Sequence, residues 1–281
     1  MKIIVATIGS RGDVQPYINL SQGLQSAGHE VTLATNPTLC SLAAEHAVNS
    51  TPVGPSIDMG VVGARLLAQS FNNMWIGMIR VMQLGARMVE QAYPDVLKAC
   101  EGADLVITSD SSTGVAEAEK LGVPWISATL QPGRIPLPPK PNPTLFERLI
   151  WPIMGKLFTA PTNRFRRRVD APLVKDLSDM MSKRMVLLPV SRFVTPNHPG
   201  WPAQVCQTGY WFAQPKVGWT PPQDLLDFLN AGEKPIAISL GVMSLSGSQA
   251  RRGAQIVLQA IQEAKVRAVI QGWDDALKGI N

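Results

Sequence analysis

The octapeptide Gly9-Ser10-Arg11-Gly12-Asp13-Val14-Gln15-Pro16 separates two segments whose apolar residues follow different patterns. Residues 2–8 before it form a β-branched, largely apolar run, which is typical of a buried strand. Residues 17–27 after it carry apolar side chains on one helix face, and Pro16 fits the first turn of that helix. The sequence predicts a strand, a glycine turn and a helix start. In a parallel sheet, such a loop opens at the carboxyl edge, where ligands bind.

The same alternation of strand and helix continues along the chain. Strands are predicted at 30–35, 104–109, 123–129 and 185–190, and helices at 37–46, 72–99 and 113–121, with further helical segments between 144 and 181. Pro94 is predicted to break or kink the 72–99 helix, and Pro52 lies in a stretch that reads as a turn. This order predicts an α/β fold with a Rossmann-like, doubly wound parallel sheet.

After Gly232 the opening pattern starts again. A strand is predicted at 235–240, followed by a turn at Gly241, a helix and a strand at 267–271. We therefore predict a first domain at 1–213, a connection at 214–234 and the incomplete start of a second Rossmann-like domain at 235–281. An incomplete sheet leaves an edge through which chains could self-associate.

Charge and cysteine content restrict the compartment and the partners. The net charge of +5 is densest at Arg164 and Arg166–Arg168, which predicts either a solvated helix face or contact with an anionic membrane or a phosphorylated ligand. An apolar run at 149–160 precedes these arginines, which suggests peripheral membrane association as a further hypothesis. No aromatic platform accompanies them, so nucleic acid is disfavoured. Three scattered cysteines, no signal peptide and no membrane-length apolar run predict a cytoplasmic protein.

Two further segments are candidate ligand walls. Apolar residues including Trp75, Met78, Ile79 and Met82 recur on one face of the predicted 72–99 helix. This stripe predicts either core packing or an adaptable wall for a bulky hydrophobic ligand. Residues 131–143 contain six prolines and predict an extended loop of the kind that carries binding function.

Asp13 is the candidate for chemistry. It lies at a strand-to-helix junction, where backbone N–H groups and the helix dipole stabilise a carboxylate. A helix cap and a general base are both compatible with this position. Gly9-x-x-Gly12 matches neither the dinucleotide fingerprint nor the phosphate-binding loop of nucleotide hydrolases.

The opening octapeptide with Tyr17, together with residues 104–110, Gly122-Val123-Pro124 and Gly209-Tyr210-Trp211-Phe212, resembles the sterol-type and glycopeptide-antibiotic-type glycosyltransferases. The resemblance implies the GT-B architecture, in which the first domain binds the acceptor and the second binds the nucleotide-sugar. It implies metal-independent, inverting transfer of a hexose from a UDP-sugar, without another cofactor, to a lipophilic alcohol such as a sterol. Asp13 would be the base. The donor would contact Ser10, Arg11, Gly12, Gly241 and Ser244, and the acceptor Trp75, Met78, Ile79, Met82, Gln131 and Pro132.

The chain departs from the family pattern in its second part. A serine expected after Gly241 is replaced by Val242, Gln271 stands where arginine is frequent, and a later His-His-Gly-Gly-Ala-Gly motif is absent from the 281 residues. The alternative hypothesis is therefore a non-catalytic, acceptor-binding half-enzyme that needs a separate donor-binding domain.

Overall fold

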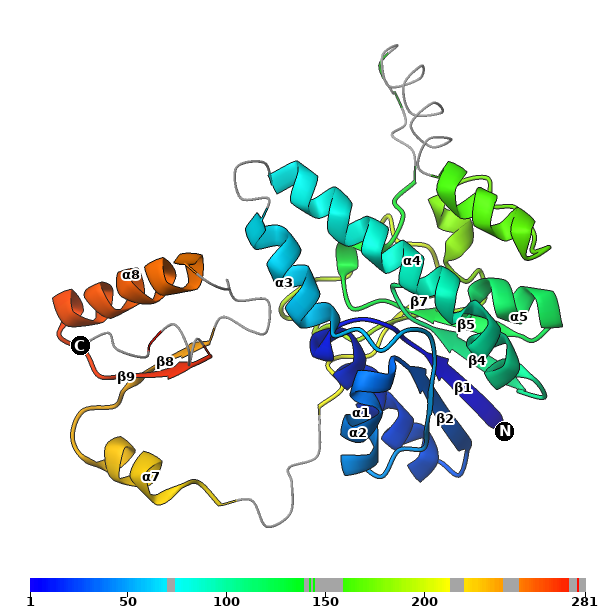
Figure 1. The fold of residues 1–281 in the computed structure, drawn as a ribbon. Coiled ribbons are helices and arrows are strands. Elements are labelled where there is room, and N and C mark those ends of the chain that lie inside the picture. Colours follow the sequence, from blue (N-terminus) through cyan, green and yellow to red (C-terminus); the bar gives the residue numbers. More distant parts are fainter. Residues whose placement is uncertain are drawn as a thin grey trace. The chain divides into compact units, whose positions relative to one another are not determined.

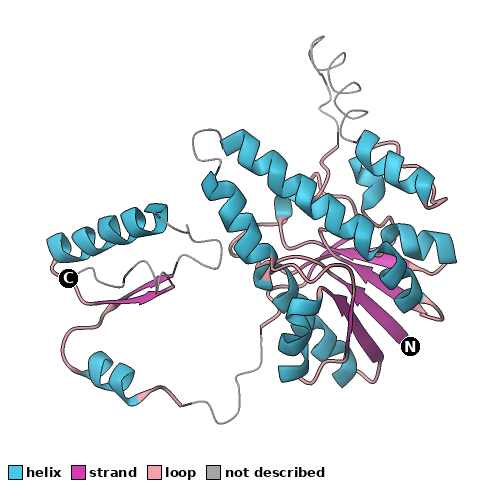
Figure 2. Cartoon of the chain, in the orientation of Figure 1, coloured by secondary structure: helices cyan, strands magenta, loops and turns pink. Residues whose placement is uncertain are grey.

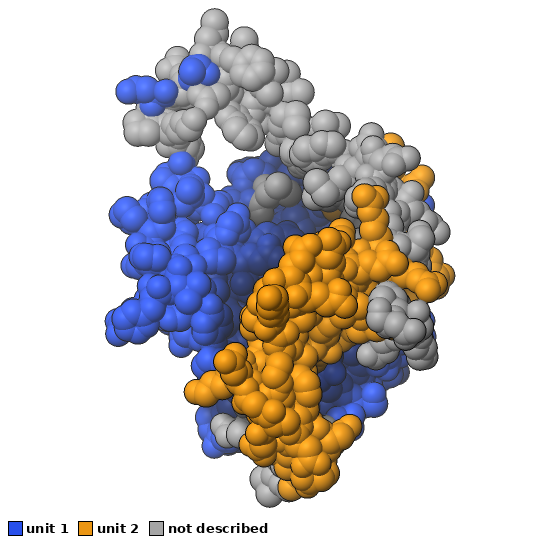
Figure 3. All heavy atoms as spheres, turned by 90° about the vertical axis from the view of Figure 1, so that its left-hand side faces the viewer, with its two compact units in different colours: residues 1–57, 85–213 blue, residues 58–84, 214–281 orange. Residues whose placement is uncertain are grey.

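A computed structural model describes residues 1–69, 74–138, 142, 144, 159–212, 220–239, 248–272 and 277 (Figures 1 and 2). The chain divides into two compact units, coloured separately in Figure 3. Unit 1 comprises residues 1–57 and 85–213, and unit 2 comprises residues 58–84 and 214–281. The domain boundaries expected at 213 and 234 stay predictions.

Unit 1 is built on a seven-stranded sheet in the order β3-β2-β1-β4-β5-β6-β7, in which every pair of neighbours is parallel. The chain moves outward from β1 to β3 and then returns to place β4 on the other side of β1. The predicted doubly wound, Rossmann-like sheet is therefore confirmed. The strands are β1 (Lys2–Ala6), β2 (Glu30–Thr35), β3 (Ser50–Pro52), β4 (Leu105–Thr108), β5 (Trp125–Ala128), β6 (Val186–Leu188) and β7 (Val205–Gln207).

Helices cover both faces of this sheet: α1 and α2 lie on one side, α4 and α5 on the other (Figure 1). Their bounds are α1 (Arg11–Ser26), α2 (Cys40–Glu45), α4 (Met74–Cys100) and α5 (Val115–Leu121), with a further helix at 159–168 and 3₁₀ turns at Pro37–Leu39, Pro132–Arg134 and Leu177–Met180. The core of the first face joins Ile3 and Val5 of β1 to Tyr17 and Ile18 of α1. This packing follows from the helical spacing of the apolar residues after the octapeptide.

Pro16 and Pro94 both lie inside helices, which contradicts the expectation for Pro16 and part of that for Pro94. Helix α1 begins at Arg11, so Pro16 lies beyond its first turn and cannot donate to the Gly12 carbonyl. Burial of Val14 and Ile18 on the same helix outweighs that lost bond. Helix α4 continues through Pro94 to Cys100, so the predicted break does not occur, whereas a kink at Pro94 stays a prediction.

Short elements were missed for a common reason. Strand β3 occupies the stretch around Pro52 that reads as a turn, and β7 was not predicted. Each spans three residues, too few to establish a two-residue period, and each is held by parallel pairing to one neighbouring strand, β3 to β2 and β7 to β6. Helix α3 (Met59–Gln69) was also not predicted. Of the predicted helical region at 144–181, the segment 145–158 lies outside the described residues.

Unit 2 contains the predicted second strand–helix–strand. Strands β8 (Ile236–Ser239) and β9 (Ala268–Gln271) pair in parallel and are joined by α8 (Ser248–Ala264), while α7 (Gln223–Asn230) precedes them. Arg267, just before β9, places its guanidinium 4.4 Å from the centre of the Phe228 ring of α7. It also donates hydrogen bonds to the backbone carbonyls of Phe228 and Glu233. Arg267 therefore fastens α7 to the strand pair.

Within the described parts of the chain, none of the helices has the length and apolarity that crossing a membrane requires.

Candidate functional site

The candidate site lies where the strand order of unit 1 reverses, at the carboxyl ends of β1 and β4. The Ser109 N–H donates to the Ala6 carbonyl at 3.1 Å, so the two strands remain joined to their last residues. The connections that follow them diverge to opposite faces of the sheet. This is the position in open α/β sheets at which a crevice forms and ligands bind.

Asp13 is the third residue of α1 and closes the turn after β1. Its Oδ2 atom accepts hydrogen bonds from the Ser10 N–H and the Ser10 hydroxyl, both at 2.8 Å. The side chain is exposed, and Oδ1 has no hydrogen-bond partner among the described residues. Asp13 therefore caps its helix with one oxygen and presents the other, which reconciles the two interpretations of its position.

Gly9 is required by the way Asp13 folds back over the turn. A Cβ atom at Gly9 would lie 2.6 Å from both the Cβ and the Oδ2 of Asp13, closer than two such atoms approach. The Gly9 N–H donates to Asn36 Oδ1 at 3.3 Å, which ties the turn to the end of β2. The glycine is therefore explained by close approach to a carboxylate.

Tyr17 joins this turn to the next loops. Its hydroxyl donates to the Ala128 carbonyl at the end of β5 at 2.8 Å. Burial raises the pKa of Tyr17 far above its usual range, and the nearby carboxylates of Asp110 and Asp13 raise it further. The hydroxyl thus remains a neutral donor that links α1 to β5.

Asp110 follows β4 at the same edge and was given no role from the sequence. Its Oδ2 accepts from the Leu130 N–H at 3.0 Å, which fixes the start of the loop after β5. Both the Asp110 and the Asp13 carboxylate raise the pKa of Tyr17, so both lie near its hydroxyl and belong to the site. The signal available in the sequence was an acidic residue directly after a predicted strand.

Six predicted site residues of unit 1 share this edge of the sheet. Ser10, Arg11, Gly12 and Asp13 form the start of α1, where the first backbone N–H groups of a helix lack intrahelical acceptors. Gln131 is exposed, and Pro132 begins a 3₁₀ turn in the loop after β5. The edge therefore offers donors suited to an anion and a carboxylate suited to accept a proton.

The other predicted residues belong to unit 2 or lie outside the description. Ile79 and Met82 lie on α4 with 53% and 63% of their surface exposed, so core packing of this stripe is wrong for both. Trp75 and Met78 lie on the same helix, and their side chains are outside the described set. Gly241 and Ser244 are outside the described residues altogether. The residues of α4 that enter a core are further along, at Met88, Ala92, Val96 and Cys100.

The described residues contain no group of three or more His, Cys, Asp or Glu side chains placed to hold a metal ion. Metal-independent chemistry stays a prediction.

Residues 3–135 match the family described as the glycosyltransferase family 28 N-terminal domain. These residues belong to that family. The matched segment includes β1 to β5 and therefore the loops after β1, β4 and β5 that carry Asp13, Asp110 and the Leu130 N–H. The predicted resemblance is confirmed for this family 28 domain.

The chain is similar to a sterol 3-beta-glucosyltransferase of Cryptococcus neoformans var. neoformans serotype D, with 32% identity over 309 aligned residues. The alignment covers 98% of the chain and 19% of the relative. The chain thus spans about a fifth of the length of the curated relatives it matches.

Solved glycosyltransferases share the fold, as the GT-B prediction required. The glycosyltransferase of kitacinnamycin superposes with a TM-score of 0.65 at 16% identity, covering 100% of this chain and 68% of that one. The Streptomyces sp. SF2575 glycosyltransferase SsfS6, solved with thymidine diphosphate, gives a TM-score of 0.57 at 19% identity, with 98% and 69% covered.

Proposed function

We propose that this chain forms the acceptor side of a glycosyltransferase that moves a hexose, glucose in the simplest case, from a UDP-sugar to a hydroxyl of a lipophilic alcohol such as a sterol. The observation that carries the proposal is the carboxylate of Asp13, exposed at the switch point with Oδ2 held by Ser10 and Oδ1 unpaired among the described residues. The names of the sterol 3-beta-glucosyltransferase relatives support the acceptor class.

In this mechanism Asp13 is the general base. Its Oδ1 takes the proton of the acceptor hydroxyl while the hydroxyl oxygen forms a bond to the anomeric carbon of the sugar. The bond from that carbon to the diphosphate oxygen breaks, and the electron pair leaves with UDP. Attack opposite the leaving group inverts the anomeric configuration. Ser10 fixes the carboxylate, so less reorientation is required when the acceptor binds.

The remaining predicted residues fall into two sets, polar groups for the diphosphate of the donor and mostly apolar groups for the acceptor. Arg11 and Gly12 at the start of α1 supply N–H and guanidinium donors for the diphosphate, and Ser10 lies beside them with its own N–H and hydroxyl donated to Asp13. The family resemblance adds Gly241 and Ser244 to the proposed donor contacts. Gln131 and Pro132, together with Trp75, Met78, Ile79 and Met82, contact the acceptor. The exposure of Ile79 and Met82 supports this assignment, because apolar side chains outside a core remain available to an apolar ligand.

The test is Asp13→Asn in the protein with its donor-binding part. We expect kcat to fall by roughly 100- to 10,000-fold, the usual contribution of a general base, with little change in acceptor affinity. Asp176→Asn is the matched control, since Asp176 also caps an exposed turn by accepting from Ser178. An Asp13→Asn enzyme with normal kcat would exclude Asp13 as the base.

A second candidate function is a non-catalytic half-enzyme that holds the acceptor for a separate donor-binding domain. It is favoured by unit 2, where the described strands form one parallel pair, and by the loss of the serine and arginine expected around Gly241 and Gln271. Isothermal titration of the 281-residue chain with UDP separates the two. Micromolar binding would contradict the half-enzyme, and absent binding would contradict transfer by the chain alone.

A further inference from the structure

A second carboxylate lies at the same edge of the unit 1 sheet as Asp13, and the proposed transfer gives it no part in the chemistry. Asp110 follows β4, and its side chain is half-buried. Its Oδ2 atom accepts from the Leu130 N–H at 3.0 Å, whereas Oδ1 has no hydrogen-bond partner among the described residues. Asp110 therefore repeats the arrangement of Asp13, in which a backbone N–H holds one carboxylate oxygen and leaves the other for a ligand.

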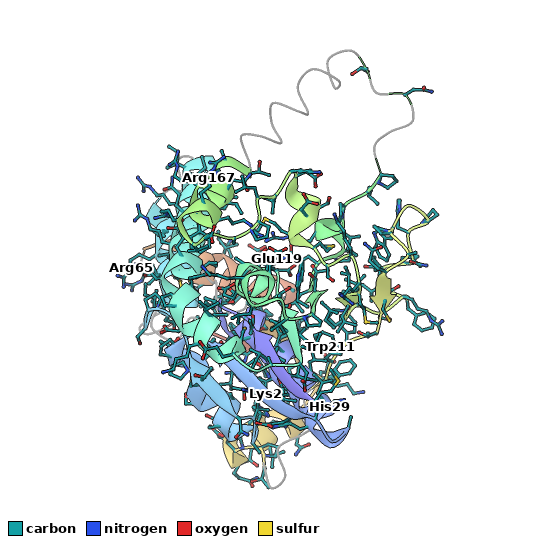
Figure 4. The ribbon with its side chains drawn as sticks, turned by 90° about the vertical axis from the view of Figure 1, so that its right-hand side faces the viewer. Lys2, His29, Arg65, Glu119, Arg167 and Trp211 are labelled. Carbon is teal, nitrogen blue, oxygen red and sulfur yellow. The ribbon has the colours of Figure 1, made fainter. Side chains whose placement is uncertain are left out.

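The position of Tyr17 shows that the two carboxylates are neighbours. Burial raises the pKa of Tyr17 most, and the carboxylates of Asp110 and then Asp13 raise it further, so both lie around the same hydroxyl. The Tyr17 ring is held in place by Trp211, labelled in Figure 4, which packs on it edge to face with 5.9 Å between ring centroids. The Tyr17 hydroxyl gives its proton to the Ala128 carbonyl at 2.8 Å, so that proton is not shared with either carboxylate.

The loops on both sides of this second carboxylate are held by hydroxyl groups. After β4, the hydroxyl oxygen of Ser111 lies 2.7 Å from that of Ser109 and 2.8 Å from that of Thr113, which is fully buried. After β5, the Gln131 N–H donates to the Thr129 hydroxyl at 3.3 Å. The hydroxyls therefore bond within their own loops, and the carboxylate between them is presented by a fixed framework.

The chemistry of a carboxylate restricts what can bind the remaining oxygen of Asp110. An ionised carboxylate only accepts hydrogen bonds, so its partner must be a donor. In the proposed reaction the neighbouring Asp13 binds the reacting hydroxyl of the acceptor. A ligand that satisfies both carboxylates therefore carries two donors close together, and hydroxyls on adjacent carbon atoms provide them.

We propose that Asp110 binds a second hydroxyl of the acceptor, on a carbon beside the one that receives the sugar. This rests on the proposed function, because the second hydroxyl is placed relative to the one that Asp13 deprotonates. Asp110 then determines specificity. An acceptor with a single hydroxyl leaves a half-buried carboxylate oxygen without a donor, which costs binding free energy, whereas a diol supplies the missing hydrogen bond.

The experiment compares the binding of three sterols to the 281-residue chain. They are cholesterol, which has one hydroxyl, and the two epimeric diols with a second hydroxyl on the carbon between the first one and the ring double bond. Tryptophan fluorescence measures the dissociation constants, with each sterol supplied from cyclodextrin. We expect one of the diols to bind about 10-fold or more tightly than cholesterol, the usual effect of a hydrogen bond to a charged group.

Two variants of Asp110 test whether it causes this preference. Asp110→Asn keeps an oxygen for the Leu130 N–H and removes the charge, so the preference for the diol should fall by about 5-fold. Asp110→Leu removes both oxygens and should abolish the preference. A loosened loop alone would weaken all three sterols equally, so the ratio of dissociation constants reports contact with the second hydroxyl.

Asp104→Asn is the matched control, because Asp104 precedes β4 at the opposite edge of the sheet and also accepts from a backbone N–H, that of Lys2, at 2.7 Å. This control should keep the ratio of the parent. The proposal is overturned if the chain binds none of the sterols, if neither diol binds more tightly than cholesterol, or if both Asp110 variants keep the ratio. Asp13→Asn should keep the ratio while transfer is lost, so failure of the catalytic proposal and failure of this one are distinguishable.

Discussion

Units 1 and 2 both contain a strand, a helix and a second strand parallel to the first, yet their strands are buried to different degrees. Ile4 of β1 is 1% exposed, whereas Ile236 of β8 is 51% exposed. Strand β1 has β2 on one side and β4 on the other, while the described residues give β8 only β9 as a neighbour. The same local pattern thus produces a core only where several such units combine.

The largest expected difference between the units is in the response to truncation of an isoleucine. Ile4→Ala should lower the free energy of unfolding by about 2–5 kcal/mol, because it leaves a cavity in the unit 1 core. Ile236→Ala should change it by less than about 0.5 kcal/mol, since half of that side chain is in water. Urea denaturation of both variants measures this. Equal losses would show that β8 is as well covered as β1.

The free energy of unfolding of unit 1 should depend on pH, because unit 1 buries a carboxyl group. Glu117 of α5 is 2% exposed, and burial raises its pKa from 4.5 to about 7, against the opposing effects of the Gly114 N–H and Arg166. Because the pKa of Glu117 is higher in the folded than in the unfolded state, Glu117 stabilises the folded protein fully below pH 4.5. This stabilisation is lost as the pH rises through 7.

The corresponding variant is Glu117→Gln. The parent should lose roughly 3 kcal/mol relative to this variant between pH 4.5 and pH 8, since one pKa unit corresponds to about 1.4 kcal/mol. Denaturation at several pH values gives the difference curve. A curve that is flat across this range would mean that Glu117 titrates normally in the folded protein.

The turn of unit 1 can be tested at Gly9. Gly9→Ala should destabilise by about 1–3 kcal/mol and displace the Asp13 carboxylate, because the added Cβ overlaps it. Gly23→Ala, on the helix α1 that follows this turn, is the control, as no atom lies within 4 Å of its added Cβ, and it should stabilise by up to about 1 kcal/mol. Thermal unfolding compares the two. If both alanines behave alike, close approach does not explain Gly9.

The smallest expected change in stability concerns the buried hydroxyl of Tyr93 in unit 1. The Tyr93 hydroxyl is buried without a hydrogen-bond partner among the described residues, so Tyr93→Phe should stabilise by about 1 kcal/mol. Tyr17→Phe should do the opposite, because it leaves the Ala128 carbonyl unpaired. Calorimetry of both variants provides the measurement. A destabilised Tyr93→Phe protein would reveal a partner for that hydroxyl.

The sequence predicted most of the fold because its strands and helices are long enough to show a period. Strand β2 was predicted with its observed bounds, and α4 within two residues at its amino end. The short strands β3 and β7 were not predicted, since pairing with a neighbour, rather than their own residues, holds them. The position of Pro16 in its helix was also predicted wrongly, because burial of the surrounding helix residues outweighs one lost backbone hydrogen bond.

The candidate site was predictable in part. Asp13 followed from its place after a strand, and the resemblance supplied Ser10 as a contact of the donor. Residue spacing could not show three features of the site. Ser10 donates to one oxygen of the Asp13 carboxylate, Gly9 leaves room for the Asp13 side chain, and Asp110 and Tyr17 lie at the same edge. These contacts join residues up to 111 positions apart, and one sequence does not encode such distances locally.

Hydrophobic periodicity and glycine placement alone determined that this chain forms a doubly wound parallel sheet with its functional turn after the first strand. Only the tertiary structure decided which residues gather at that edge and which apolar side chains stay outside the core. The physical reason is that periodicity shows which face of an element is apolar, whereas burial depends on whether another element covers that face. Met82 and Phe193 are apolar residues whose exposure became visible only in the folded chain.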